Sequence, residues 1–148
     1  MANLLNRYKN TSSRLPKKRR YDDVDYVSRI DAGGDFHRIY DIEVLISSWT
    51  NILETPTRTY IFDPTYGSDL YKLIWEPTDD KTYDAIEREV EEKLTTYDNR
   101  GIIDHTDIKF LPNQKGFSVD VYFTYAGEKG QLSVIMSEDK YFNILRAV

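Results

Sequence analysis

The chain has 148 residues, enough for one domain with a modest core but too few for two. It contains no cysteine, which excludes disulfides and thiolate metal sites, and the separation of His37 and His105 does not suit a metal site. No apolar run approaches the roughly 20 residues that span a bilayer, and no signal-peptide pattern is present. We therefore expect a protein made in a cytoplasm, with no metal, no cofactor and no membrane partner.

The formal net charge of -5 is unevenly distributed along the chain. Residues 1–20 carry seven basic side chains and no acidic one, whereas the rest of the chain carries 13 basic and 25 acidic side chains. The densest basic run consists of Lys17, Lys18, Arg19 and Arg20. We interpret residues 1–20 as a basic N-terminal arm that docks on an acidic surface, and residues 21–148 as a single domain. The 12 tyrosines favour a component of an assembly, because tyrosine is enriched at interfaces.

The first predicted helix begins at Asp41, a suitable N-cap, and is stopped by Pro56. Its apolar residues recur at the spacing of one helical face. These residues are Ile42, Leu45, Ile46, Trp49, Ile52 and Leu53. The next segment, Thr57 to Phe62, is rich in β-branched and aromatic residues, which predicts an extended conformation.

A rigid turn is predicted directly after this segment. Pro64 fixes its own φ and favours an extended Asp63 before it, while Gly67 supplies backbone freedom. Phe62 and Tyr66 flank the turn with aromatic rings. The run is typical of a structural corner between two elements and not of a catalytic loop.

Two more helices are predicted after this turn. A short helix spans residues 70–75, with Ser68 or Asp69 as its cap, and a longer helix spans about residues 80–97. The predicted apolar face of the longer helix comprises Tyr83, Ile86, Val90, Leu94 and Tyr97. Trp49 and Trp75 fall on or near apolar helical faces, so we expect both in the core.

The remaining sequence alternates with a period of two residues, which predicts strands. Three such runs, residues 106–110, 117–125 and 132–136, are separated by turns that contain glycine. We predict an α+β fold, with N-terminal amphipathic helices packed on one face of a small C-terminal three-stranded antiparallel sheet. Such a sheet has two edges that other chains can extend by strand addition.

This order of elements and motifs resembles the baseplate wedge family of contractile phage tails, the sheath-initiator family that also occurs in type VI secretion baseplates. The motifs that carry the resemblance lie within residues 40–137 and are Leu53-Glu54-Thr55, Pro64-Thr65-Tyr66-Gly67 and Arg100. Two departures stand out. The family's Gly-x-Arg falls on Arg58-Thr59-Tyr60, so that turn must be built differently, and the family's Glu-Pro before the arginine is Asp98-Asn99.

The resemblance implies two contact sites. In the family, the matching arginine faces a bundle of helices from two larger wedge proteins, which implies partner binding by Asp98, Asn99, Arg100, Phe62, Pro64, Tyr66 and Gly67. The family's sheet pairs with arms of the first sheath ring, which implies a sheath-contacting strand edge at Leu132, Val134 and Met136. From the residues alone, Arg100 could equally pair with the last carbonyls of the helix before it.

We therefore predict a non-enzymatic subunit of the virion baseplate, assembled in the host cytoplasm, that docks on the wedge helical bundle and templates sheath polymerisation by strand pairing. The alternative is a lysozyme-like peptidoglycan hydrolase, a label that the family has at times carried. Such chemistry needs two carboxylates flanking a cleft, and Glu54 and Glu76 adjoin apolar residues but lie at helix ends bounded by proline. A third hypothesis, nucleic-acid binding by the basic arm, is opposed by the acidic body. No small-molecule substrate is expected.

Overall fold

The computed structural model describes residues 21–24, 30, 32–113, 115–138 and 143–147. The chain divides into two compact units, Met1–Val44 and Leu45–Val148. The basic arm, including Lys17, Lys18, Arg19 and Arg20, lies outside the described residues, so its boundary and its docking stay predictions. No helix in the described part of the chain combines the length and the apolar character needed to cross a membrane.

The first unit contains a two-stranded antiparallel ribbon, formed by β1 (Asp22–Val24) and β2 (Arg38–Tyr40). Hydrogen bonds between Tyr21 and Asp41 close one end of this ribbon. The Asp41 main-chain N donates to Tyr21 O at 3.1 Å, and the Asp41 carboxylate accepts from Tyr21 N at 3.1 Å. Asp41 thus joins the ribbon to the helix that follows it.

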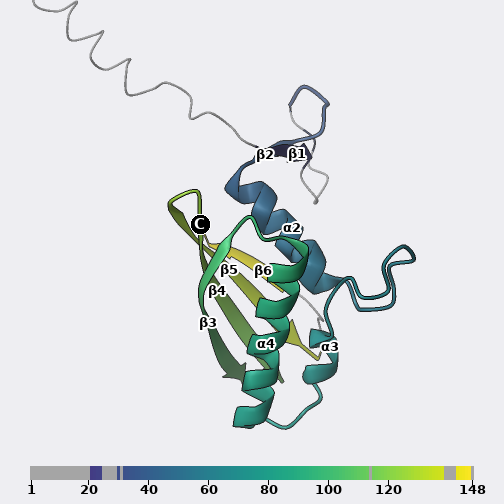
Figure 1. The fold of residues 1–148 in the computed structure, drawn as a ribbon, viewed down its shortest axis with the longest axis vertical. Helices are drawn as coiled ribbons and strands as arrows, with labels where there is room; N and C mark the ends of the chain where they lie inside the picture. Colours follow the sequence, from purple (N-terminus) through teal and green to yellow (C-terminus); the bar gives the residue numbers. More distant parts are fainter. Residues whose placement is uncertain (1–20, 25–29, 31, 114, 139–142, 148) are drawn as a thin grey trace, which may run out of the picture. The chain divides into compact units, whose positions relative to one another are not determined.

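Three helices follow along the chain (Figure 1). They are α2 (Ile42–Glu54), α3 (Leu70–Leu73) and α4 (Asp80–Tyr97). Helix α2 has the predicted bounds and stops just before Pro56. Helix α4 is capped by Asp79, whose carboxylate accepts a hydrogen bond from Thr82 N at 2.9 Å. It ends at the predicted residue, Tyr97.

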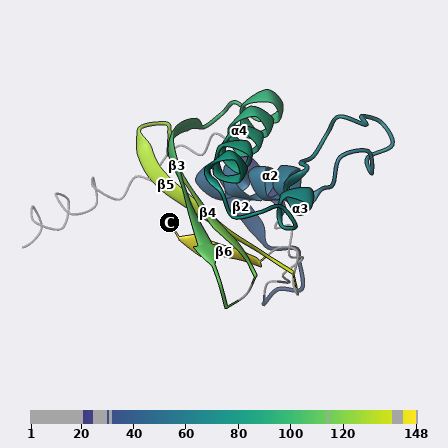
Figure 2. The same ribbon diagram turned by 90° about the horizontal axis from the view of Figure 1, so that it is seen from below.

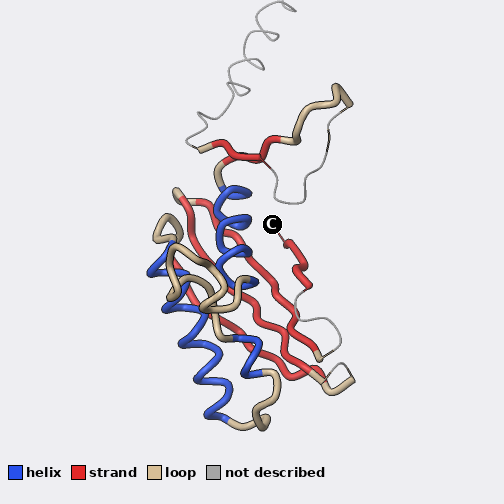
Figure 3. The backbone as a smooth tube through the Cα atoms, turned by 90° about the vertical axis from the view of Figure 1, so that its right-hand side faces the viewer, coloured by secondary structure: helices blue, strands red, loops and turns tan. Residues whose placement is uncertain are grey.

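The second unit ends in an antiparallel sheet of four strands in the order β3-β4-β5-β6 (Figure 3). The strands are β3 (Ile102–Leu111), β4 (Gly116–Tyr125), β5 (Glu128–Ser137) and β6 (Asn143–Ala147). The first three contain the three predicted runs. Strand β6 is an addition, and it pairs with β5 from Gln131↔Ala147 to Ile135↔Asn143. In β3, a bulge between Ile103 and His105 shifts the register with β4.

The core of the second unit lies between the helices and one face of the sheet (Figure 2). Trp49 of α2 packs edge-to-face on Phe123 of β4, with ring centroids 4.9 Å apart, and Tyr83 of α4 packs on Phe117 at 6.0 Å. The buried apolar residues of β4 and β5 are Phe117, Val119, Val121, Phe123, Tyr125, Leu132, Val134 and Met136. The predicted α+β class, with helices on one face of the sheet, is confirmed.

Two predictions about single elements are wrong. The segment from Thr57 to Phe62 is a loop with turns, because among the described residues no strand lies beside it to pair with its backbone. Trp75 is 61% exposed instead of lying in the core. Helix α3 ends at Leu73, two residues before the predicted end. Ile74, directly after the helix, is still buried, whereas the indole of Trp75 faces solvent.

Candidate docking site

A loop of residues 56–69, which we call the aromatic loop, extends away from the helices and sheet between α2 and α3 (Figure 1). A parallel bridge between Pro56 and Ser68 joins its two ends, and Ser68 N donates to Thr55 O at 2.8 Å. The buried hydroxyl of Ser68 donates to Leu53 O at 2.7 Å. These bonds tie the base of the loop to the last turn of α2.

Gly67 is required at this base. Its φ is 98°, a value that residues with side chains rarely adopt, and a Cβ at Gly67 would overlap the carbonyl oxygen of Thr55. Because Gly67 is also buried, it can serve a docking site only by shaping the loop.

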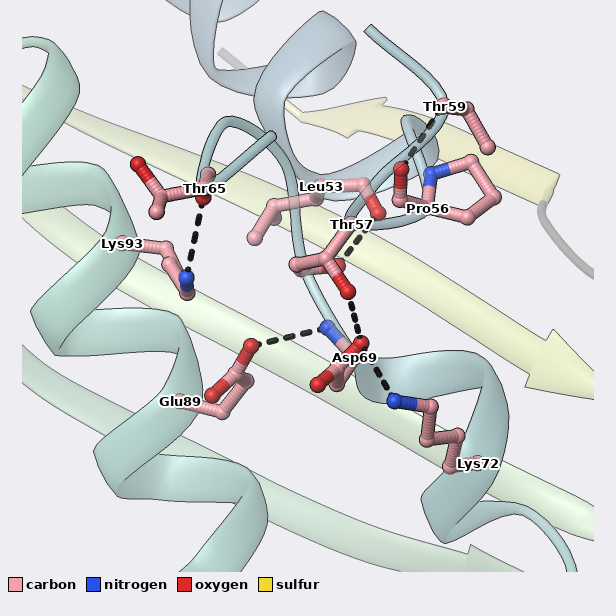
Figure 4. A network of polar contacts seen from close by, with 10 residues as sticks. Leu53, Pro56, Thr57, Thr59, Thr65, Asp69, Lys72, Glu89 and Lys93 are labelled. Atoms are coloured by element: carbon pink, nitrogen blue, oxygen red, sulfur yellow. Dashed lines mark hydrogen bonds and ion pairs between the residues drawn. The ribbon is translucent and has the colours of Figure 1, made fainter. Parts of the chain in front are cut away.

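Helix α4 holds the loop from the side (Figure 4). Its Glu89 carboxylate accepts a hydrogen bond from the main-chain N of Asp69 at 2.8 Å. One turn further along, the Lys93 ammonium donates to Thr65 O at 3.2 Å. Thr65 and Asp69, in the second half of the loop, are therefore both bonded to α4.

The Asp69 side chain links the loop to α3 (Figure 4). Its carboxylate accepts a hydrogen bond from the Thr57 hydroxyl and pairs with the Lys72 ammonium at 2.9 Å, and it makes no capping bond to α3. Burial acts to raise the pKa of Asp69, but the bonds from Thr57 and Lys72 outweigh it and leave that pKa lowered. The same hydrogen bond raises the pKa of Lys72.

The predicted turn at Pro64 is built on Asp63. The Asp63 carboxylate accepts from Thr65 twice, from the main-chain N at 2.9 Å and from the hydroxyl at 2.6 Å. These two bonds lower the pKa of Asp63. Across the loop, Arg58 N donates to Pro64 O at 2.9 Å, with Arg58 in the left-handed region at φ 68°.

A series of aromatic rings connects the loop with α4. The Tyr60 ring lies 5.7 Å from that of Phe62 and 5.2 Å from that of Tyr66, and Tyr66 lies 5.1 Å from Tyr97. The Tyr97 hydroxyl donates to Thr65 Oγ1 at 2.8 Å. Burial raises the pKa of Tyr66, and the nearby Tyr60 and Asp98 raise it further, so its hydroxyl stays protonated at neutral pH.

The corner after α4 is equally well fixed. The Asp98 carboxylate accepts from Arg100 Nε at 2.8 Å and from Arg100 Nη2 at 2.5 Å, a bidentate pair. Trp49 Nε1 donates to Asp98 O at 3.1 Å, and a Cβ at Gly101 would lie 2.8 Å from the Trp49 ring. Burial acts to raise the pKa of Asp98, but hydrogen bonds from Arg100 and Ser48 outweigh it, and the pKa is lowered.

The predicted partner-binding residues come from two stretches of the chain, residues 62–67 and residues 98–100. The structure brings these stretches together, because Tyr66 contacts Tyr97 and Tyr97 precedes Asp98. Phe62, Pro64 and Asn99 are exposed, Tyr66 and Arg100 are half-buried, and Asp98 and Gly67 are buried. Sequence reasoning missed Tyr60 and Ile61, which it placed in a strand. Their apolar character next to an Asp-Pro turn was the available signal for an exposed loop tip.

The predicted strand edge is wrong as placed. Strand β5 pairs with β4 on one side and with β6 on the other, so it is an interior strand. Leu132, Val134 and Met136 point into the core and have no exposed surface. The C-terminal residues that form β6 cover the backbone that would otherwise be open, and the sheet edges are β3 and β6.

Comparison with known proteins agrees with the predicted family. The chain is 26% identical over 106 residues to baseplate wedge protein gp25 of Enterobacteria phage T4, covering 72% of this chain and 79% of gp25. No family model matches the chain.

Two solved structures share the fold. A chain of the anti-feeding prophage baseplate has a TM-score of 0.65 at 15% identity, covering 73% of this chain and 86% of that chain. A putative tail lysozyme from Geobacter sulfurreducens has a TM-score of 0.57 at 18% identity, covering 71% and 91%. The chain is thus similar to a baseplate wedge protein in sequence and to these two structures in fold, which confirms the predicted resemblance to the baseplate wedge family.

Proposed function

We propose that the chain is a structural, non-enzymatic subunit of the baseplate wedge in a contractile tail, where it docks on the helical bundle of larger wedge proteins. The observation that carries this proposal is the joining of the aromatic loop to the Asp98–Arg100 pair through Tyr66 and Tyr97. A single rigid surface with exposed apolar residues and a fixed guanidinium suits protein docking, since little side-chain freedom is lost on binding.

The Asp98–Arg100 pair gives the docking surface its specificity. The Arg100 side chain is 27% exposed, and its planar fork is held in one orientation by the buried Asp98 carboxylate. A guanidinium held in this way can add hydrogen bonds to carboxylate or carbonyl oxygens of a partner at little entropic cost. The docking role of Arg100 thus depends on Asp98 as its support.

The same subunit starts sheath polymerisation, through strand addition at an edge of its sheet. Strand β3 has ten residues, and among the described strands β4 alone pairs with it. Ile102 and Phe110 on this strand are 69% and 40% exposed. A long edge strand with exposed apolar side chains favours addition of a strand from another chain. We assign the sheath contact to β3, in place of the interior strand β5.

Replacement of Arg100 tests the docking role. Arg100→Lys keeps the positive charge but loses the planar fork, so we expect the variant to fold normally and to bind wedge proteins at least about tenfold more weakly. Binding is measured with baseplate wedges isolated from particles assembled without this subunit. Equal binding by the lysine variant and the parent would show that Arg100 only stabilises the end of α4 and has no docking role.

A peptidoglycan hydrolase is the second candidate, because one similar structure carries the description of a putative tail lysozyme. A glycosidase needs a carboxylic acid whose pKa is raised. The described carboxyl groups with displaced pKa values, Asp63, Asp69 and Asp98, are all displaced downwards. This favours the structural role, and a zone of clearing by the purified chain in a peptidoglycan zymogram would reverse that preference.

A further inference from the structure

The largest exposure of apolar side chains in the described residues occurs at the tip of the aromatic loop. Ile61 is 89% exposed and Phe62 is 87% exposed, and the neighbouring Tyr60 is 46% exposed. The Tyr60 and Phe62 rings are in contact and Ile61 lies between them in the chain, so the three exposed side chains gather at the loop tip, which we call the apolar patch. Contiguous exposed apolar surface on a folded domain marks a site of contact with another molecule.

The tip is held in place by bonds within the loop. Thr59 donates to Pro56 O through its main-chain N at 3.3 Å and its hydroxyl at 2.7 Å. The Tyr60 ring packs between Phe62 and Tyr66, which anchors the tip to the ring series. A protrusion that is already ordered loses little conformational entropy when a partner covers it.

Arg58 at the start of the tip is strained and unpaired. Its φ of 68° is a left-handed conformation that is unfavourable for a residue with a side chain and that glycine adopts freely. The Arg58 side chain is exposed, and its guanidinium has no hydrogen bond or ion pair with any described residue. A residue kept at a cost to folding, with its functional group presented to solvent, points to a role in binding.

The charges around the tip define what it can bind. The Asp63 carboxylate is already engaged by two hydrogen bonds from Thr65, whereas the charge of Arg58 has no partner among the residues that the structure describes. An apolar patch beside a free guanidinium complements an apolar pocket with carboxylates on its rim. The patch is continuous with the Asp98–Arg100 pair through the rings of Tyr66 and Tyr97.

We propose that the tip, Arg58 to Phe62, is the anchor of the docking site. Ile61 and Phe62 fill an apolar pocket on a neighbouring baseplate wedge protein, and Arg58 pairs with carboxylates at the rim of that pocket. This inference rests on the proposed function and adds to it the chemistry of the partner surface. It also gives the tip, not the Asp98–Arg100 pair, the larger share of the affinity.

The test compares tip variants with matched controls in binding to baseplate wedges isolated from particles assembled without this subunit. The double variant Ile61→Ser with Phe62→Ser should bind at least about 30-fold more weakly, and Trp75→Ser, which removes another exposed aromatic side chain, should bind like the parent. Arg58→Glu should weaken binding most at low salt, and Lys81→Glu, a charge reversal at another exposed position, should not. Thermal melting of every variant should stay within a few degrees of the parent.

The outcomes separate the anchor from the proposed function. Failure of the parent chain to bind these wedges would overturn both. Binding of the parent that Arg100→Lys weakens, and that the tip variants leave unchanged, would overturn the anchor and keep the function. Loss of self-association of the chain, without loss of wedge binding, would show that the tip meets a second copy and would also overturn the anchor.

Discussion

Asp98 is the buried residue that supports Arg100 in the docking surface. It is only 7% exposed, so burial alone would favour its protonated form. The carboxylate stays ionised because Arg100 donates two side-chain hydrogen bonds to it. Separately, the main-chain carbonyl of Asp98 accepts a hydrogen bond from Trp49 Nε1. Asp98 thus orients Arg100 on the surface and fixes the corner between α4 and β3 to the core.

The state of Asp98 gives a prediction for stability against pH. Its pKa is lowered by folding from the ordinary value of 3.8, so its stabilising effect is fully present above that value and is lost as pH falls through the lower folded pKa. Asp98→Asn should reduce the free energy of unfolding by about 2 kcal/mol at pH 7. The difference between parent and variant in urea unfolding should shrink below pH 3.8. A difference that is constant from pH 7 to pH 3 would contradict the ion pair.

Among the helices and strands, the sequence predicts those whose apolar residues recur at a regular local spacing. Helix α4 and strand β4 have regular apolar periods, and the structure has them at nearly the predicted residues. Strand β5 contains its predicted run but begins earlier, at Glu128, within the predicted turn. The aromatic loop was mistaken for a strand because residue preference cannot reveal whether a partner strand is present. Strand β6 was missed because the five residues Asn143–Ala147 do not alternate between apolar and polar, so only their pairing with β5 identifies them as a strand.

Strand β6 gives a prediction for removal of the C-terminal residues of the chain. Truncation after Glu138 removes β6 and leaves β5 as an open edge, with its side chains still in the core. The truncated chain should fold with a lowered melting temperature and enter the baseplate, because the docking site is intact. Tails built on it should have reduced or misplaced sheath, since the ten-residue β5 then replaces the five-residue β6 as the second edge and competes with β3 for strand addition. Electron micrographs with normal sheath length would contradict this role of the edges.

At the scale of the whole molecule, the candidate site was predictable in its parts but not in its assembly. Phe62, Tyr66 and Arg100 came from motifs in two separate stretches, and only the fold places Tyr66 against Tyr97 and so next to Asp98. The Asp-Pro turn signalled a loop at this point, but the high exposure of Ile61 and Phe62 could not be predicted, because the exposed fraction of a side chain is a property of the folded chain. The distribution of charge along the chain follows directly from the sequence. An acidic domain with a basic arm is consistent with several contacts in one assembly.

Whether the chain is a structural subunit of a tail baseplate can be tested directly in the assembled particle. An affinity tag at the N-terminus, far in sequence from the aromatic loop and the sheet, allows the subunit to be labelled with gold on purified tails. We predict label at the baseplate end of each tail, at the junction with the sheath, and loss of that label when Ile61 and Phe62 are both replaced by serine. Label spread along the tail, or purified particles without the subunit, would contradict the account.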